Sequence, residues 1–268
     1  PVRRVNASTA TVPAPAPARA AELPLRTRFA IFIRLLAIQG SWNYEILMGN
    51  GMGFCLEPAL RLLPQGVKSP EFHQALARES RYFNAHPYLA SVAVGALARA
   101  ELDGEDPVRI ERFRTALCGP LGSVGDRLVW AGWLPFCSLA SLAVFGFHAR
   151  PLVVVGGFLL AYNLGHFALR IWGLNTGWNH GLRVASALGN PVLRRGPQMI
   201  ARLAALTTGI AIPLALGRII GPGRNFIGGV LLSVALGSFL IVRLQGRIEG
   251  WRLTLVILAA LALFSVTR

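Results

Sequence analysis

The chain has 268 residues, of which 53% are hydrophobic and only 15% are charged, and its formal net charge is +15. A soluble domain carries charges on about a quarter of its residues. The low charged fraction and the mean hydropathy of +0.50 therefore disfavour a soluble globule, a disordered chain and a disulfide scaffold. A nucleic-acid binder would suit the positive charge, but that charge reflects scarce acids, and the composition favours an integral membrane protein.

The acidic residues are distributed unevenly along the chain. Eleven of the twelve lie at or before Asp126, and Glu249 is the one that follows. We therefore expect three regions. Residues 1–25 predict a disordered tail rich in Pro and Ala, without the apolar run of a signal peptide. Residues 26–130 predict a polar and amphipathic helical region, and residues 131–268 a transmembrane helical region.

The region after the tail predicts short helices of differing polarity. Residues 28–48 predict an amphipathic helix, either at the membrane interface or packed in a bundle. Residues 70–87 predict a helix with mixed charges, and residues 103–114 a charged stretch that faces water. Residues 88–98 are apolar but about half as long as a membrane span. A re-entrant hairpin and a buried helix are equally compatible with them.

The last region predicts about five membrane segments, over residues 131–147, 151–169, 198–217, 226–242 and 253–267. The expected fold class is all-α: a polytopic membrane protein with amphipathic and, in one of the two open interpretations, re-entrant helices before these segments. Arginines gather in the connections 170–197 and 243–252. The positive-inside rule then places these connections and the N-terminus in the cytoplasm.

Motifs for catalysis are missing from the sequence. It has no nucleotide-binding loop, hydrolase elbow, zinc-protease motif or kinase motif. Cys55, Cys118 and Cys137 are widely spaced, which predicts reduced thiols and neither a disulfide nor a metal site. The predicted membrane segments contain no acidic residue, which disfavours transport driven by a proton relay. We expect no catalytic residue, no metal and no cofactor.

The first polar segment at an unexpected depth is QGSWNYE, residues 39–45. Amide side chains bond sugar hydroxyls in both directions, and an aromatic face covers the apolar face of a sugar ring. This composition predicts substrate contact or a translocation path through Gln39, Trp42, Asn43 and Glu45. In the alternative, which is equally open, Gln39 and Asn43 share one helix face and join helices.

Two further segments combine glycines with polar residues. In residues 119–130, glycines at three-residue spacing predict a tight turn or a close backbone approach, and Asp126 is expected to cap the helix that follows. In residues 163–181, the Gly, Asn and Trp content predicts a loop at a membrane edge. Packing between subunits and ligand contact are both compatible with that loop.

Taken together, these segments resemble the IID component of mannose-family sugar phosphotransferase systems. The resemblance covers about residues 27–190, and the most specific part is the Gly-Pro-Leu-x-x-x-Gly-Asp motif. Its motif positions here are Asn84, Gly119, Pro120, Gly122, Gly125 and Asp126. The segments that carry it are QGSWNYE (39–45), GMGFCLEPALRLL (51–63), ESRYFNAHP (79–87), LCGPLGSVGDRLVW (117–130) and NLGHFALRIWGLNTGWNHG (163–181).

The resemblance implies a function without a phosphorylated residue on this chain. Members of the family pair with a IIC subunit in the bacterial inner membrane. The pair takes up a hexose of the mannose type and delivers it to a cytoplasmic IIB domain, which with IIA supplies the phosphoryl group from phosphoenolpyruvate. The implied partners are IIC, IIA and IIB, the sugar, the lipid bilayer and further copies of the IIC–IID pair, and no nucleic acid. The alternative is a scaffold or regulator that keeps the fold without transport.

Overall fold

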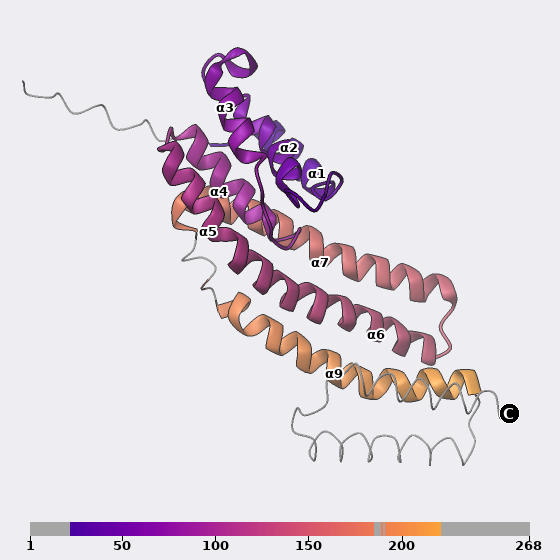
Figure 1. Ribbon diagram of the computed structural model, residues 1–268. Coiled ribbons are helices and arrows are strands. Elements are labelled where there is room, and N and C mark those ends of the chain that lie inside the picture. The colour runs from indigo at the N-terminus through magenta and orange to yellow at the C-terminus, as the bar shows by residue number, and fades with distance from the viewer. Residues whose placement is uncertain (1–21, 185–188, 190, 221–268) are drawn as a thin grey trace, which may run out of the picture.

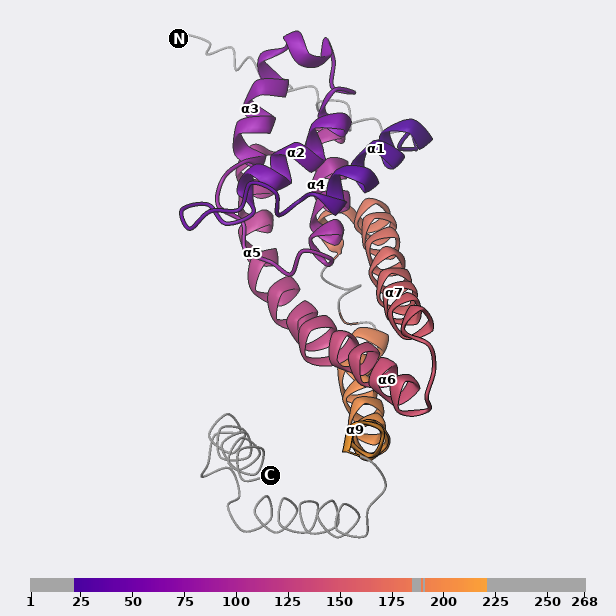
Figure 2. The same cartoon turned by 90° about the vertical axis from the view of Figure 1, so that its right-hand side faces the viewer.

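The structure is a computed structural model that describes residues 22–184, 189 and 191–220, and two groups of helices make it up (Figure 1). A body of shorter helices, α1 to α5, lies at one end, and a layer of long helices, α6, α7 and α9, extends away from it (Figures 1 and 2). The elements are α1 (Leu25–Leu36), α2 (Gly49–Leu60), η1 (Gly66–Lys68), α3 (Pro70–Glu79), α4 (Ala90–Leu102), α5 (Pro107–Gly125), the π-helical segment η2 (Asp126–Trp133), α6 (Leu134–Gly146), α7 (Pro151–His180), η3 (Gly181–Arg183) and α9 (Pro191–Ile220).

The helix expected over residues 28–48 is shorter than its apolar pattern predicts. It is α1, which follows Pro24, ends at Leu36 and buries Ile31 and Leu35. The next residues are in turns and a loop up to α2, because Gly, Ser and Asn residues favour turns over a continued helix. The prediction of a helix beyond Leu36 is therefore wrong.

The helix expected over residues 70–87 is α3, and it also ends early. The Ser69 side chain accepts a hydrogen bond from the backbone N–H of Phe72, which caps the start of the helix. The helix ends at Glu79. Beyond it, Phe83 exchanges backbone hydrogen bonds with the loop before α2, and its side chain is fully buried. These tertiary contacts hold residues 81–89 in a non-helical path.

Residues 88–98 form most of α4, a single helix that is buried along nearly its whole length. A hairpin is therefore ruled out for them, and they are the buried helix of the two alternatives. α4 packs lengthwise on the last turns of α7 through glycines. A Cβ on Gly177 would lie 2.1 Å from the Val92 carbonyl oxygen, and one on Gly95 would lie 2.3 Å from the Leu174 carbonyl oxygen. The two helix backbones are thus in direct contact.

Two ion pairs lie inside the body, where charges need close partners. Arg78 donates hydrogen bonds to the Glu101 carboxylate from its Nε and Nη2 atoms, at distances of 2.7 to 3.0 Å. Arg114 is 1% exposed and Glu79 is fully buried, and their Nε and Oε2 atoms lie 3.2 Å apart. Burial, and the nearby Glu101 carboxylate, raise the pKa of Glu79 well above its ordinary value.

α5, η2 and α6 form one continuous helix over Pro107–Gly146. The membrane segment expected over 131–147 therefore does not start after a turn, and the expected division after residue 130 falls inside this helix. The helix ends where His148 takes a positive φ of 63° before Pro151 begins α7.

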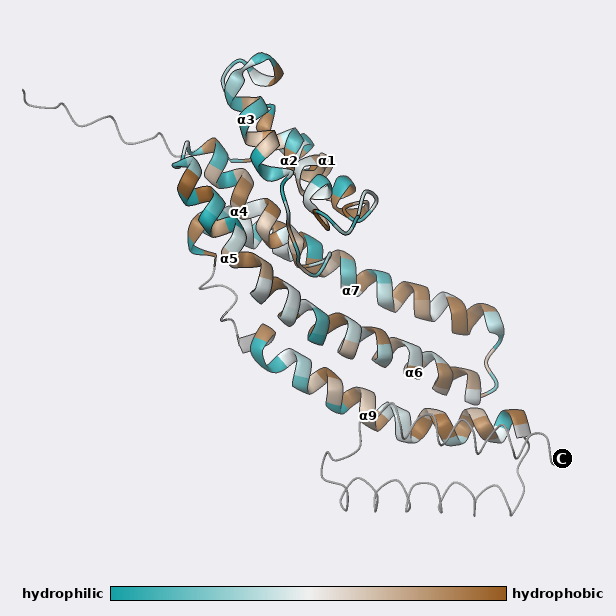
Figure 3. Ribbon diagram, in the orientation of Figure 1, coloured by the Kyte–Doolittle hydropathy of each residue, from teal (hydrophilic) through white to brown (hydrophobic). Residues whose placement is uncertain are grey.

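Within the part of the chain that the structure describes, three helices are long and apolar enough to cross a membrane: Pro107–Gly146, Pro151–Arg183 and Leu193–Ile219. Apolar residues are abundant on α6, α7 and α9 where these extend beyond the body (Figure 3). The segment expected over 151–169 continues as helix to His180, so the loop predicted over 163–181 is wrong. The segment expected over 198–217 lies within α9. Of the tail expected over 1–25, residues 1–21 lie outside the described residues, whereas Leu23 is buried and α1 begins at Leu25. The two segments expected over 226–242 and 253–267 also lie outside the described residues.

Candidate functional site

The residues predicted to contact sugar, Gln39, Trp42, Asn43 and Glu45, lie in the loop between α1 and α2. The Asn43 carboxamide oxygen accepts hydrogen bonds from the backbone N–H groups of Glu45 and Ile46, both at 3.0 Å. The Trp42 ring meets the Tyr44 ring edge to face at 4.8 Å, and Trp42 is 44% exposed. Since Gln39 and Asn43 are not on a helix, the alternative of a shared helix face is wrong.

The stretch that holds Asn84 and the helix that holds the other motif residues meet at Gly125. Asn84 is exposed in the irregular stretch after α3, while Gly119, Pro120 and Gly122 lie within α5. Gly125, at the end of α5, is pressed against this stretch, because a Cβ there would lie 2.2 Å from the Cβ of His86. The close approach predicted from the glycine spacing is confirmed at Gly125, and the predicted tight turn is not, because the chain stays helical.

The sequence predicted that Asp126 caps a helix, and this prediction is wrong. Its backbone has helical angles, φ −61° and ψ −43°, and it opens the π-helical segment within the continuous helix. Its side chain is exposed, and no hydrogen bond or ion pair to it is found among the described residues. A cap requires free backbone N–H groups, and inside a continuous helix these are already used.

An aromatic and basic cluster lies beside this contact, between the body and α7. The Tyr88 and Tyr162 hydroxyl groups are 2.6 Å apart, and the His166 ring stacks on Tyr88 at 5.0 Å. The Arg170 guanidinium covers the Tyr88 ring at 4.3 Å and donates two hydrogen bonds to the Leu35 carbonyl oxygen. Arg170 is 4% exposed and therefore joins α1, α7 and Tyr88 inside the protein.

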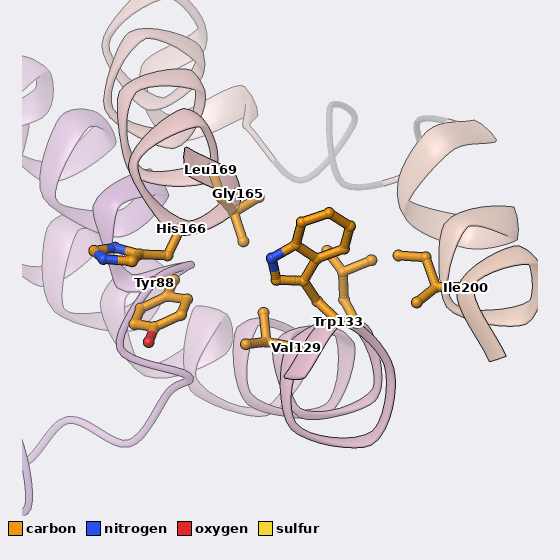
Figure 4. A pocket seen from close by; sticks show the side chains of 8 residues that line it. Tyr88, Val129, Trp133, Gly165, His166, Leu169 and Ile200 are labelled. Atoms are coloured by element: carbon orange, nitrogen blue, oxygen red, sulfur yellow. The ribbon is translucent and has the colours of Figure 1, made fainter. Parts of the chain in front are cut away.

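An apolar pocket of about 170 Å³ adjoins the cluster (Figure 4). It lies between η2, α7 and α9. In the view of Figure 4 the Trp133 side chain lies between Gly165 and Ile200. The Trp133 indole N–H is buried and has no hydrogen-bond partner among the described residues, so it could donate to an acceptor atom in the pocket. The lining residues are Tyr88, Leu128, Val129, Trp133, Gly165, His166, Leu169 and Ile200.

The described residues hold no group of three or more His, Cys, Asp or Glu side chains that could bind a metal ion. The three cysteines are unpaired. Burial raises the pKa of the Cys55 thiol to about 12, so that it is protonated and unreactive at neutral pH. The chemistry of this region is therefore stacking and hydrogen bonding, without an evident nucleophile or general base.

His86 is buried against Gly125 and contacts the Tyr88 and Trp130 rings. Its Nδ1 accepts a hydrogen bond from the Tyr88 backbone N–H at 3.2 Å, which assigns the proton of the neutral ring to Nε2. Burial and the positive charge of Arg170 lower the pKa of His86 to about 4. The ring is therefore uncharged in the folded protein at neutral pH.

We expect His86→Gln to reduce the sensitivity of the fold to acid. Between pH 6.5 and about 4 the unfolded state binds a proton that the folded state does not, so stability falls as the pH falls. From pH 7 to pH 5 the unmodified protein should lose about 2 kcal/mol more than the variant. Thermal melting in detergent at both pH values measures this, with His73→Gln, at an exposed position, as the control. Equal pH dependence in all three proteins would contradict it.

The cluster was not predicted, although part of its signal is present in the sequence. Tyr162, His166 and Arg170 are spaced four residues apart, which places them on one face of a helix. Because a loop was predicted over 163–181, the four-residue spacing was not interpreted as one face of a helix. Tyr88 and His86 belong to a distant segment, so only the folded chain shows that they join this face.

Comparison with known proteins shows the family of the chain. The sequence matches the family described as PTS system mannose/fructose/sorbose family IID component over residues 22–213. It is 30% identical over 205 residues to the PTS system mannose-specific EIID component of Escherichia coli, which covers 70% of each chain. It is 30% identical to the fructose permease IID component of Bacillus subtilis, over 71% of this chain and 73% of that one. It is 31% identical to the sorbose-specific EIID component of Klebsiella pneumoniae, over 68% and 67%.

Solved structures share the fold. One is the mannose transporter ManYZ in complex with a microcin, with a TM-score of 0.55 and 22% identity, over 91% of this chain and 97% of that one. Another, described as a membrane protein, has a TM-score of 0.67 and 20% identity, over 92% and 98%. The chain belongs to the mannose/fructose/sorbose family of IID components, which are multi-pass membrane subunits of bacterial sugar phosphotransferase permeases and not the phosphorylating enzymes.

Proposed function

We propose that this chain pairs with a IIC subunit and that the pair carries a hexose of the mannose type to a cytoplasmic IIB domain, which phosphorylates the sugar as it enters. The observation that carries the proposal is the uncovered apolar surface of α7. None of the most apolar window of that span is buried by the described residues, and Leu152, Leu160 and Leu164 are exposed. Lipid, a second membrane subunit or the part of this chain outside the described residues can cover it.

The size of the pocket also supports a partner. Ligand pockets that enclose a small molecule have volumes of about 300–1,000 Å³, whereas the pocket near Trp133 has about 170 Å³. A sugar site formed at this pocket by this chain alone would be incomplete. A partner that adds a wall to the site would complete it, and the solved relative in fold is named as an assembly, ManYZ.

We also propose that the loop of residues 39–45 contributes to the sugar path or to the contact with IIC. Trp42 presents an exposed aromatic face, and Gln39 and Glu45 are exposed beside it. The Asn43 side chain bonds the backbone of its own loop, so its role is to hold the loop in shape. The first test of the site therefore targets Gln39 and Trp42.

Uptake of radiolabelled sugar tests the proposal in cells without their own mannose-type permease. The chain is expressed with IIC, IIA and IIB proteins of the same family, and mannose, fructose and sorbose are compared. We expect phosphoenolpyruvate-dependent uptake of at least one of these sugars, lost when this chain is omitted. Replacement of Gln39 and Trp42 together by alanine should reduce uptake about tenfold or more, because about 1 kcal/mol is lost for each contact. Gln74→Ala, at an exposed position on α3, is the matched control.

Two results would contradict parts of the proposal. Full uptake by the Gln39 and Trp42 double variant would remove the loop from the sugar path. A chain that copurifies with IIC but supports no uptake of any sugar would favour the scaffold or regulator.

The proposed setting is the bacterial inner membrane, with a cytoplasmic N-terminus and more than one IIC–IID pair in each assembly. Arg170, counted as a loop charge for that orientation, in fact lies inside α7.

A further inference from the structure

α1 carries an apolar stripe that no described residue covers. The stripe is separate from the face formed by Ile31 and Leu35, which is buried in the body. With 3.6 residues per turn, positions 25, 29, 33 and 36 fall on one side of the helix. Exposure there decreases from 79% at the first position to 42% at the last, and the residues are Leu25, Phe29, Ile33 and Leu36.

A basic groove of about 380 Å³ runs between α1 and α2, directly beside the stripe. Three of its lining residues are arginines, Arg26, Arg34 and Arg61, and one is acidic, Glu57. Glu57 forms ion pairs with Arg34, at 2.7 Å, and with Arg61. The groove therefore keeps an excess of two positive charges. Arg26 follows the first stripe residue in sequence, so that a guanidinium group borders the apolar surface.

The position of α1 along α7 is a third, independent observation. α1 contacts α7 through Phe32, whose ring lies 6.0 Å from that of Phe167, and through the hydrogen bonds from Arg170 to Leu35. Residues 151–169 of α7 are the uncharged, apolar part of that helix. At 1.5 Å per residue this stretch is about 28 Å long, close to the roughly 30 Å of the hydrocarbon core. α1 therefore crosses α7 at the level where the hydrocarbon ends.

We propose that α1 lies in the interface of the bilayer, with its stripe in the hydrocarbon boundary, and that Arg26, Arg34 and Arg61 bind the phosphate group of an anionic phospholipid. Guanidinium groups form paired hydrogen bonds to phosphate. An apolar stripe flanked by arginines is the pattern of helices that lie on anionic membranes. The inference rests on the membrane location of the family and is independent of the sugar and of transport.

A bilayer fits the three observations better than a protein partner does. A partner subunit could cover the apolar stripe, but it would not require that the stripe lie at the end of an apolar span. The groove opens next to the stripe, which is where a phosphate lies relative to its acyl chains. An excess of two positive charges in the groove is also the complement of a phosphate, with its one or two negative charges.

Lipid binding to the full chain in detergent tests the proposal, by native mass spectrometry with phosphatidylglycerol and phosphatidylcholine. The test variant replaces Arg26 and Arg61 by glutamine. The matched control is Arg109→Gln, because Arg109 and Arg61 are 62% and 60% exposed and each pairs with a glutamate four residues away. Each arginine near an anionic headgroup contributes about 1 kcal/mol, or about fivefold. We expect about 30-fold weaker binding of phosphatidylglycerol by the double variant and no change in the control.

A second measurement locates the helix. Phe29→Cys and Val108→Cys carry a fluorophore in vesicles that contain phosphatidylglycerol and a phospholipid with a nitroxide near the headgroup. The unmodified chain, labelled in parallel, gives the background of its own cysteines. Both positions are exposed on the body, and Val108 lies at the charged start of α5. We expect strong quenching at position 29 and little at position 108.

Four results would overturn the proposal. Equal binding of the two lipids, or an unchanged double variant, would show that the groove does not recognise the anionic headgroup. Displacement of the bound lipid by millimolar inorganic phosphate would identify a site for free phosphate. Loss of copurifying IIC from the Phe29→Cys protein, without quenching by the nitroxide lipid, would show that the stripe is a protein interface.

Discussion

Replacement of Gly177 by alanine is expected to lower the melting temperature of the protein by about 10 °C. The added Cβ would lie 2.1 Å from the Val92 carbonyl oxygen and 2.7 Å from the Ala96 backbone nitrogen. These are backbone atoms of α4 and cannot turn aside as a side chain can, so the two helices must separate. Overpacking of a core costs about 1–3 kcal/mol, and in a chain of this size 1 kcal/mol shifts the melting temperature by about 2–4 °C.

The same helix supplies the control for this prediction. A Cβ on Gly156 of α7 would meet no atom within 4 Å. Gly156→Ala should leave the melting temperature unchanged or raise it slightly, because alanine favours a helix by about 1 kcal/mol over glycine. Melting is followed by near-UV circular dichroism in detergent. If both variants melt at the same temperature, the backbones of α4 and α7 are not in the close contact described above.

Removal of the Arg114 side chain, as in Arg114→Leu, should destabilise the protein by about 3–5 kcal/mol. The side chain donates hydrogen bonds to the backbone carbonyls of Glu79, Arg81 and Tyr82. It also supplies the positive charge next to the buried Glu79 carboxylate. An ion left unpaired in a protein interior costs this much. Arg112→Leu, two residues earlier on the exposed face of α5, should change stability by less than about 0.5 kcal/mol.

Two comparisons separate the lost charge from lost packing. Leucine at both Glu79 and Arg114 should recover part of the stability, because no buried ion remains. The single variant should also lose less relative to the unmodified protein at pH 5 than at pH 8. The pKa of Glu79 is raised in the folded state, so its protonation, which removes the unpaired charge, becomes easier as the pH falls. A destabilisation independent of pH would contradict this explanation.

The sequence predicted the features that depend on neighbouring residues. The start of the helix expected at residue 70 is confirmed: α3 begins at Pro70, and the Ser69 side chain caps it. The glycine spacing near residue 119 predicted a close backbone approach, which occurs between Gly125 and His86. Apolar length predicted the spans within α7 and α9, and charge predicted the exposed start of α5.

Features that depend on distant segments were not predictable in the same way. Residues 163–181 contain many loop-forming residues, yet they are helical because Gly173 and Gly177 let α7 pack tightly against α4. The turn expected near Asp126 is absent, since Gly125 makes room for the His86 side chain and the chain stays helical there. The contacts of Tyr88 with Tyr162 and Arg170 join positions more than 70 residues apart. The division of the chain after residue 130 stays a prediction about function.

The continuous helix over Pro107–Gly146 connects the body directly to the layer of long helices. Its 40 residues correspond to a rod of about 60 Å, which is about twice the hydrocarbon thickness of a bilayer. The rod begins in the body and ends in the layer of long helices, with no flexible linker between them. A tilt of about 10° at one end would displace the other end by about 10 Å. A tilt of this helix as one unit would therefore move the body and the membrane layer together.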